Sequence, residues 1–158
     1  MRHISRLALA LLAVAALAAC GGRGPEQTIR SYEESVLNWD ASSVPSKQKS
    51  VLQLLAEGYQ PEDGAAAFTS SGFVAAVTAQ KLSSEGKVLT VDLKVIDQAH
   101  MAAVALVRFK TQPLGTQGWR SDEFVLNLEH GQWRIASIHI QVLPAVDQPA
   151  KWQLPRVH

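Results

Sequence analysis

Apolar and polar residues follow two different periods along this chain of 158 residues. From about residue 26 to residue 82 the apolar side chains recur every three or four positions, which is typical of one face of a helix. The first such run consists of Ile29, Tyr32, Val36 and Trp39. The pattern predicts three helices, over residues 25–40, from 46 to a stop at Gly58, and over 71–82, with a turn at 59–64 and a closing turn at 83–86.

The period changes to two from Val88 onward, where apolar and polar residues alternate as in a half-buried strand. Residues 101–109 are apolar at nearly every position, which favours a more central strand, and two further strands are expected over 124–128 and 133–143. Glycine and proline predict a loop over 112–118 and a turn at Gly131. Helices followed by strands indicate an α+β domain, with N-terminal helices packed on one face of a curved, mostly antiparallel sheet.

The N-terminus carries a targeting pattern. Arg2 and Arg6 precede an uncharged apolar run over residues 7–19, which is shorter than the roughly 20 residues that a spanning helix needs. A basic start, a short apolar run and small residues before a cleavage site are typical of a signal peptide. The sequence Leu-Ala-Ala-Cys at 17–20 resembles the lipobox of bacterial lipoproteins. The resemblance implies that residues 1–19 are removed and that Cys20 carries a diacylglycerol.

The chain between the lipid and the first helix is short. Residues 20–25 form the lipidated cysteine and its tether, and the five residues after Cys20 span at most about 18 Å. The domain is therefore expected to work close to the membrane to which Cys20 attaches it. Gly21 is not the aspartate that is associated with inner-membrane retention, so the resemblance implies the periplasmic face of the outer membrane.

Composition excludes several kinds of site. Cys20 is the only cysteine, so its lipidation leaves no disulfide, no reactive thiol and no thiolate metal ligand. Loss of residues 1–19 changes the formal net charge from +1 to −1, and no basic stripe indicates a nucleic-acid partner. The histidines at 100, 130 and 139 lack metal-ligand spacing. No phosphate-binding or dinucleotide motif occurs, so neither a metal nor a cofactor is expected.

Three stretches resemble the nuclear transport factor 2-like superfamily, which includes SnoaL-like, ketosteroid-isomerase-like and lumazine-binding proteins. They are residues 25–40, residues 96–102, and residues 122–135, the last of which contains the Gly-x-Trp-x-Ile of a closing hairpin. The resemblance implies that residues 26–144 form a cone-shaped half-barrel with a pocket between helices and sheet. Residues 145–158 would be an irregular C-terminal tail.

The expected pocket lining combines aromatic and strand residues: Tyr32, Trp39, Trp133, Ile135 and His139. In the superfamily a histidine in the Trp-x-Ile-x-x-x-His pattern can face the pocket and act as an acid or base. A solvated or dimer-facing sheet surface is the commoner place for such a histidine. Asp122 is a second candidate base, although no motif places it in that role.

These features support three hypotheses. The leading one is a non-catalytic, lipid-anchored domain of the cell envelope that binds a small apolar ligand or an envelope protein partner. The second is a SnoaL-like or ketosteroid-isomerase-like enzyme with acid–base chemistry in an apolar pocket. The third is a scaffold or assembly lipoprotein that forms a homodimer, or docks on an envelope complex, through an open sheet face.

Overall fold

The computed structural model describes residues 22–59 and 64–144 of the chain. The predicted signal peptide, Cys20 and the predicted C-terminal tail at 145–158 lie outside the described residues. Four helices precede four strands: α2 (Pro25–Leu37), α3 (Val44–Leu52), α4 (Gly64–Thr69), α5 (Ser71–Gln80), β1 (Ser83–Val95), β2 (His100–Gln112), β3 (Gln117–Glu129) and β4 (Gln132–Leu143). The predicted α+β fold, with helices packed against a curved antiparallel sheet, is confirmed.

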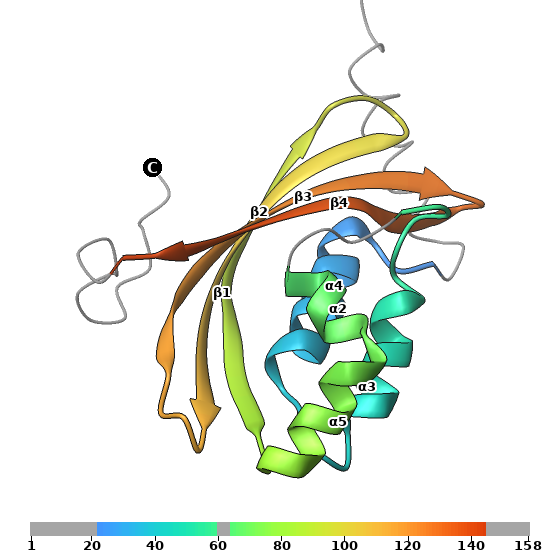
Figure 1. Cartoon of the computed structure of the whole chain (residues 1–158). Helices are drawn as coiled ribbons and strands as arrows, with labels where there is room; N and C mark the ends of the chain where they lie inside the picture. Colours follow the sequence, from blue (N-terminus) through green and yellow to red (C-terminus); the bar gives the residue numbers. More distant parts are fainter. Residues whose placement is uncertain (1–21, 60–63, 145–158) are drawn as a thin grey trace, which may run out of the picture.

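The strands form one antiparallel meander in the order β1-β2-β3-β4. Irregularities of register interrupt the β1–β2 pairing at Val88/Thr90 and the β3–β4 pairing at Val125/Leu126, and such bulges bend strands and increase their twist. The sheet therefore curls, and the helices lie on its inner side (Figure 1). His130 and Gly131 adopt positive φ angles of 49° and 75°, as the tight turn between β3 and β4 requires.

Helix α2 packs diagonally across the inner face of the sheet. Pro25 suits the first helical turn, and Ile29, Tyr32 and Leu37 provide its buried face. At one end, the Thr28 hydroxyl donates to the Trp133 carbonyl at the start of β4, over 3.4 Å. At the other end, the Asn38 side-chain carbonyl accepts from the Gly86 amide near the start of β1, over 3.0 Å. Two opposite corners of the inner face consequently extend beyond this helix.

Helix α3 runs back along α2, and the segment after it pairs with the edge of the sheet. The Ala56 amide donates to the Ile135 carbonyl, and the Ile135 amide donates to the Leu54 carbonyl, both over 2.8 Å. Leu55 and Ile135 thereby form a parallel bridge. This short pairing gives β4 a neighbour on its outer side without a full strand.

Several predicted boundaries were wrong. The first helix ends at Leu37 and not at residue 40, and the third strand begins at Gln117, inside the predicted loop, and not at residue 124. The second helix ends at Leu52 and not at Gly58, which lies in a later turn with φ 75°. Residues 64–69, of which only residue 64 was predicted as turn, form helix α4, and Ser70 then caps α5 by accepting from the Phe73 amide over 3.3 Å. Residues 83–86 belong to β1 and not to a turn, because Ser84 exchanges backbone hydrogen bonds with Trp39. That contact joins residues far apart in sequence, so local pattern could not reveal it.

Candidate functional site

Four of the five predicted pocket residues belong to one hydrophobic core or pack against it, and the fifth, His139, is exposed. Tyr32 and Ile135 are fully buried in the core, where the Tyr32 ring meets the Phe124 ring edge-on with centroids 5.6 Å apart. Trp39 follows the C-terminal end of α2 and packs on Phe73. Trp133 is half-buried at the start of β4, and His139 is exposed on β4 opposite Glu123. The structure thus brings Tyr32 and Ile135 into one core, packs Trp39 and Trp133 against its margin, and places His139 on the exposed surface.

Asp122, the second candidate base, belongs to a buried cluster that joins β3 to α2. The Arg120 Nε donates to both Asp122 carboxylate oxygens over 2.8 and 2.7 Å, and its Nη2 donates to Glu33 Oε2 over 3.0 Å. Both carboxyl groups are 0% exposed, whereas the arginine side chain is 15% exposed. Tyr32 lies beside Glu33 in the chain, and its hydroxyl group is the fourth polar group of this cluster. We call these four residues the buried acid cluster.

One positive charge faces two carboxyl groups in this cluster. Burial, followed by the proximity of Asp122, raises the pKa of Glu33 well above its ordinary value, and the attraction of Arg120 offsets only part of this. Burial and the neighbouring Glu33 also raise the pKa of the Tyr32 hydroxyl. Glu33 therefore keeps its proton to a higher pH than an ordinary glutamate does, which reduces the negative charge that faces Arg120.

A carboxyl group of raised pKa beside a second carboxyl group has the chemistry of an acid–base pair, but here both groups are fully buried. Within the described residues, Glu33 Oε1 and the Tyr32 hydroxyl are buried without a hydrogen-bond partner. The surface hollows described below are lined by other residues. The geometry therefore favours a structural role, in which the cluster fixes the position of α2 on β3.

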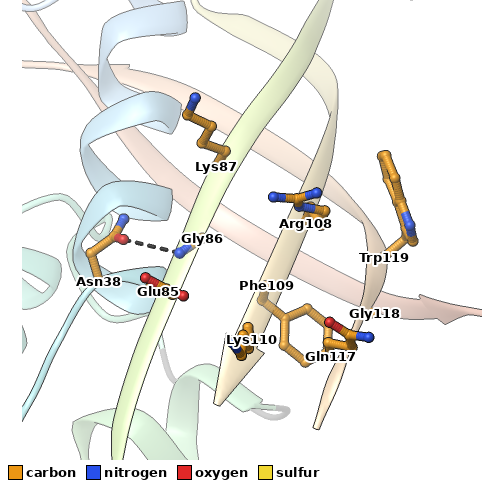
Figure 2. A pocket seen from close by; sticks show the side chains of 10 residues that line it. All are labelled: Asn38, Glu85, Gly86, Lys87, Arg108, Phe109, Lys110, Gln117, Gly118 and Trp119. Carbon is orange, nitrogen blue, oxygen red and sulfur yellow. Dashed lines mark hydrogen bonds between the residues drawn. The ribbon is translucent and has the colours of Figure 1, made fainter. Parts of the chain in front are cut away.

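A basic hollow of the described surface lies at the opposite end of the sheet from the β3–β4 turn. It has a volume of about 620 Å³ and is formed mainly by three adjacent cross-strand rows on β1, β2 and β3 (Figure 2). The rows are Glu85–Lys110–Gln117, Gly86–Phe109–Gly118 and Lys87–Arg108–Trp119. Adjacent residues of a strand point to opposite faces of a sheet. The first and third rows therefore project to one face and form two walls, and the backbone of the middle row forms the floor between them.

This basic trough, named for its two walls, carries an excess of positive charge. Lys87, Arg108 and Lys110 face a single acidic residue, Glu85, and these four side chains are exposed. Trp119 is half-buried at the end of one wall. Cations beside an aromatic ring suit an acidic partner surface that also presents an apolar group.

His139 lines a second hollow of about 620 Å³ near the β3–β4 turn. Glu57, Tyr59 and Glu129 also line it, and the Tyr59 hydroxyl accepts from the Ile138 amide over 3.2 Å. The hollow is open and partly acidic, and it is separated along the sheet from the basic trough. His139 pairs with Glu123, the residue after Asp122, so its side chain points to the face of the sheet opposite the buried Asp122. The two candidate bases therefore do not share a site.

Two features were missed at the level of sequence, although a signal existed for each. Ile29, Glu33 and Leu37 are four residues apart, so the helical pattern itself places a carboxyl group on the buried face. Arg108 and Lys110 are two apart on an apolar strand, which places two cations on one sheet face. Lys87 and Trp119 join them only through strand pairing.

No protein-family model and no curated protein matches this sequence. Solved structures share its fold at low sequence identity. An IcmL-like type IV secretion system protein from Legionella pneumophila is 13% identical, with a TM-score of 0.58, over 78% of this chain and 96% of that chain.

Two further structures are similar over most of their length. The periplasmic domain of DotI is 9% identical with a TM-score of 0.54, over 78% of this chain and 99% of that one. CagV, a VirB8 homologue of the type IV secretion system from Helicobacter pylori, is 10% identical with a TM-score of 0.53, over 73% and 95%. At these identities the similarity establishes the fold alone. Within residues 22–59 and 64–144, no helix is long and apolar enough to cross a membrane.

Proposed function

We propose that this protein is a lipid-anchored, non-catalytic domain on the periplasmic side of the outer membrane, where it docks a protein of an envelope assembly. The observation that carries the proposal is the basic trough, an open polar hollow with three cations and a tryptophan on three paired strands. Such a surface is suited to an acidic protein segment, because complementary charge directs association and excludes wrong partners.

The position of the trough relative to the anchor supports a protein partner. Gly22 lies beside the β3–β4 turn, where a Cβ on it would be 3.0 Å from the Gly131 carbonyl oxygen, and Cys20 is two residues earlier. The trough lies at the other end of β3. A straight strand of this length spans up to about 40 Å. A lipid on Cys20 would therefore hold the trough away from the membrane, facing soluble or periplasmic domains.

The comparisons support a place in a multi-protein assembly. Two of the three similar structures are a protein of a type IV secretion system and a homologue of one, and the third is described as a periplasmic domain. The same fold in this chain is compatible with a scaffold role in the envelope. The lipobox-like Cys20 supplies the means of attachment in this proposal.

A small apolar ligand between helices and sheet is a weaker alternative. Tyr32, Phe124 and Leu126 occupy that space with exposures of 0%, 2% and 0%. The enzyme hypothesis rests on the buried acid cluster, whose raised Glu33 pKa is the property expected of a catalytic acid. Its two carboxyl groups are 0% exposed, so a substrate could reach them only if α2 moved away from β3.

Site-specific photo-crosslinking in cells tests the proposed docking. A benzophenone amino acid replaces Gln117, which is exposed in the trough on β3. In a matched control it replaces Asp92 on β1, which is exposed on the same outer face of the sheet but outside the trough. We expect a discrete product with another envelope protein from position 117 and none from position 92. The double variant Lys87→Glu/Lys110→Glu should reduce that product several-fold, because it replaces attraction of an acidic segment by repulsion.

Other products would contradict the proposal in distinguishable ways. A product that contains only a second copy of this chain would favour a homodimer formed through the sheet. The absence of a discrete product from position 117 in membrane-attached protein would exclude the trough as the docking surface. A product that survives the charge reversal unchanged would exclude charge as its basis.

A further inference from the structure

An apolar patch is exposed at the β1–β2 hairpin. Leu93, Val95 and Ile96, the hairpin patch, are 41%, 63% and 56% exposed. Val95 pairs with Met101, and Leu93 pairs with the buried Ala103, so both point to the inner face of the sheet. They are uncovered because α2 reaches β1 only at its other end, where Asn38 contacts Gly86.

The hairpin patch lies at the end of the sheet where the described chain begins. The Leu128 amide donates to the Ala99 carbonyl over 2.8 Å, which places the β1–β2 turn beside the last residues of β3. Gly22 lies against Gly131 in the turn that follows β3. Strands are about 4.8 Å apart, so the patch on β1 is about 10 Å across the sheet from β3.

Cys20 is two positions before Gly22, which is a distance of about 7 Å at most. A lipid on Cys20 would therefore bring this end of the sheet to the membrane surface. Leu52, which is 56% exposed, lies at the same end of the sheet. The segment just after it bonds to Ile135 near the start of β4. Aliphatic side chains that are solvent-exposed next to a membrane anchor are favourably buried at the interface of a bilayer.

We infer that the hairpin patch rests in the boundary between headgroups and acyl chains of the membrane that holds Cys20. The inference depends on the proposed lipid anchor. The hairpin patch would give the protein a second contact with the membrane, which fixes the orientation of a domain otherwise attached only through Cys20. The anchor makes this contact effectively intramolecular, so a small apolar area suffices for it. Asp97 and His100, whose side chains are 2.8 Å apart in the turn, remain at headgroup level. The orientation directs the basic trough away from the membrane.

Fluorescence of the lipidated protein in vesicles of phosphatidylethanolamine and phosphatidylglycerol tests this inference. Because Cys20 would carry lipid, Ile96→Cys introduces a single free thiol for an environment-sensitive nitrobenzoxadiazole label. The matched control is Leu114→Cys, which is 67% exposed in the β2–β3 turn at the far end of the sheet. We expect a blue-shifted emission and several-fold quenching by spin-labelled lipid at position 96, and neither at position 114.

A second variant tests whether the apolar side chains cause the contact. Leu93→Ser/Val95→Ser should abolish the quenching at position 96 while the protein still floats with the vesicles, because the lipid on Cys20 remains. Unchanged quenching in this variant would overturn the inference. Equal quenching at positions 96 and 114, or at neither, in protein that floats would also overturn it.

The remaining outcomes separate this inference from the anchor. Protein that shows no diacylglyceryl mass and does not float would overturn the anchor and the inference together. A label at position 96 that is already blue-shifted without vesicles, and does not change on adding them, would show that another part of the protein or a second copy covers the patch. That outcome would overturn the inference that the hairpin patch contacts the bilayer.

Discussion

Glu33 shows how a single residue can be misjudged when its neighbours along the chain are the only information. It occupies the buried face of α2 between Ile29 and Leu37, where a carboxylate would be unstable without a partner. Arg120 and Asp122 supply the partners from β3, 87 and 89 positions away. Asp122 was singled out as a candidate base from sequence, but its burial and its pairing with Arg120 depend on that long-range contact.

The raised pKa of Glu33 predicts a specific pH dependence. Between its ordinary value of 4.5 and the higher value in the folded protein, the folded state keeps a proton that the unfolded state loses. Wild-type stability should therefore fall as pH rises through this window. Glu33→Gln mimics the neutral acid and should remove that decline, with stability within about 1 kcal/mol of wild type at acid pH. Urea unfolding at a series of pH values measures how the free energy of unfolding of each protein changes with pH. The same pH dependence in wild type and Glu33→Gln would contradict the prediction.

Arg120→Ala should destabilise the protein strongly. The substitution leaves Asp122 buried beside Glu33 without a counter-charge, and breaking such a pair costs about 3–5 kcal/mol. The loss should be smaller at acid pH, where the raised pKa of Glu33 keeps that carboxyl group neutral. Arg108→Ala, an exposed arginine on the neighbouring strand, is the matched control and should change stability by less than about 0.5 kcal/mol. Equal unfolding midpoints for the two variants would contradict a structural role for the cluster.

At the scale of elements, the contact between α2 and β1 determines where the helical layer ends. Leu37 approaches the backbone of β1 at Gly86, and Asn38 bonds to the Gly86 amide. A Cβ at Gly86 would be 2.6 Å from the Arg108 carbonyl oxygen and 3.0 Å from the Leu37 Cβ. This close approach requires glycine, and it explains why β1 begins at Ser83, before its alternating apolar pattern.

Gly86→Ala should therefore destabilise the protein by about 1–3 kcal/mol, as overpacking of a close contact does. Gly72→Ala provides the comparison, because nothing lies within 4 Å of a Cβ at this position in α5. Alanine favours helix over glycine, so this control should be neutral or stabilising by up to about 1 kcal/mol. Thermal unfolding of both variants measures the difference, and a stable Gly86→Ala protein would show that α2 can shift on β1.

At the scale of the whole molecule, the described domain has two distinct ends. Gly22 and the hairpin patch lie at one end of the sheet, and the basic trough lies at the other. Figure 1 shows the β1–β2 and β3–β4 turns on one side of the crossing strands and the β2–β3 turn on the other. This polarity gives the proposed anchor a functional consequence, since it would present the trough to proteins rather than to lipid.

Cys20→Ala tests the anchor in the whole protein. Without the thiol no diacylglycerol can be attached, and the apolar run over residues 7–19 is too short to span a bilayer. We expect the protein to move from the membrane fraction to the soluble fraction and to lack the mass of the lipid. Gly21→Ala, which keeps the thiol, should remain in the membrane fraction. Retention of the Cys20→Ala protein in that fraction would contradict lipid attachment as its anchor.

The sequence by itself determined the order of elements and the α+β class, because the helical and strand periods are local properties that survive without tertiary contacts. It also carried the targeting pattern that ends at Cys20. Tertiary structure alone decided what depends on residues distant in sequence: the burial of Glu33 and Asp122 around Arg120, the early start of β1, and the separation of His139 from Asp122. The basic trough has the same origin. Lys87, Arg108 and Trp119 form one row only because antiparallel register places three strands side by side, and register follows from how the buried faces pack.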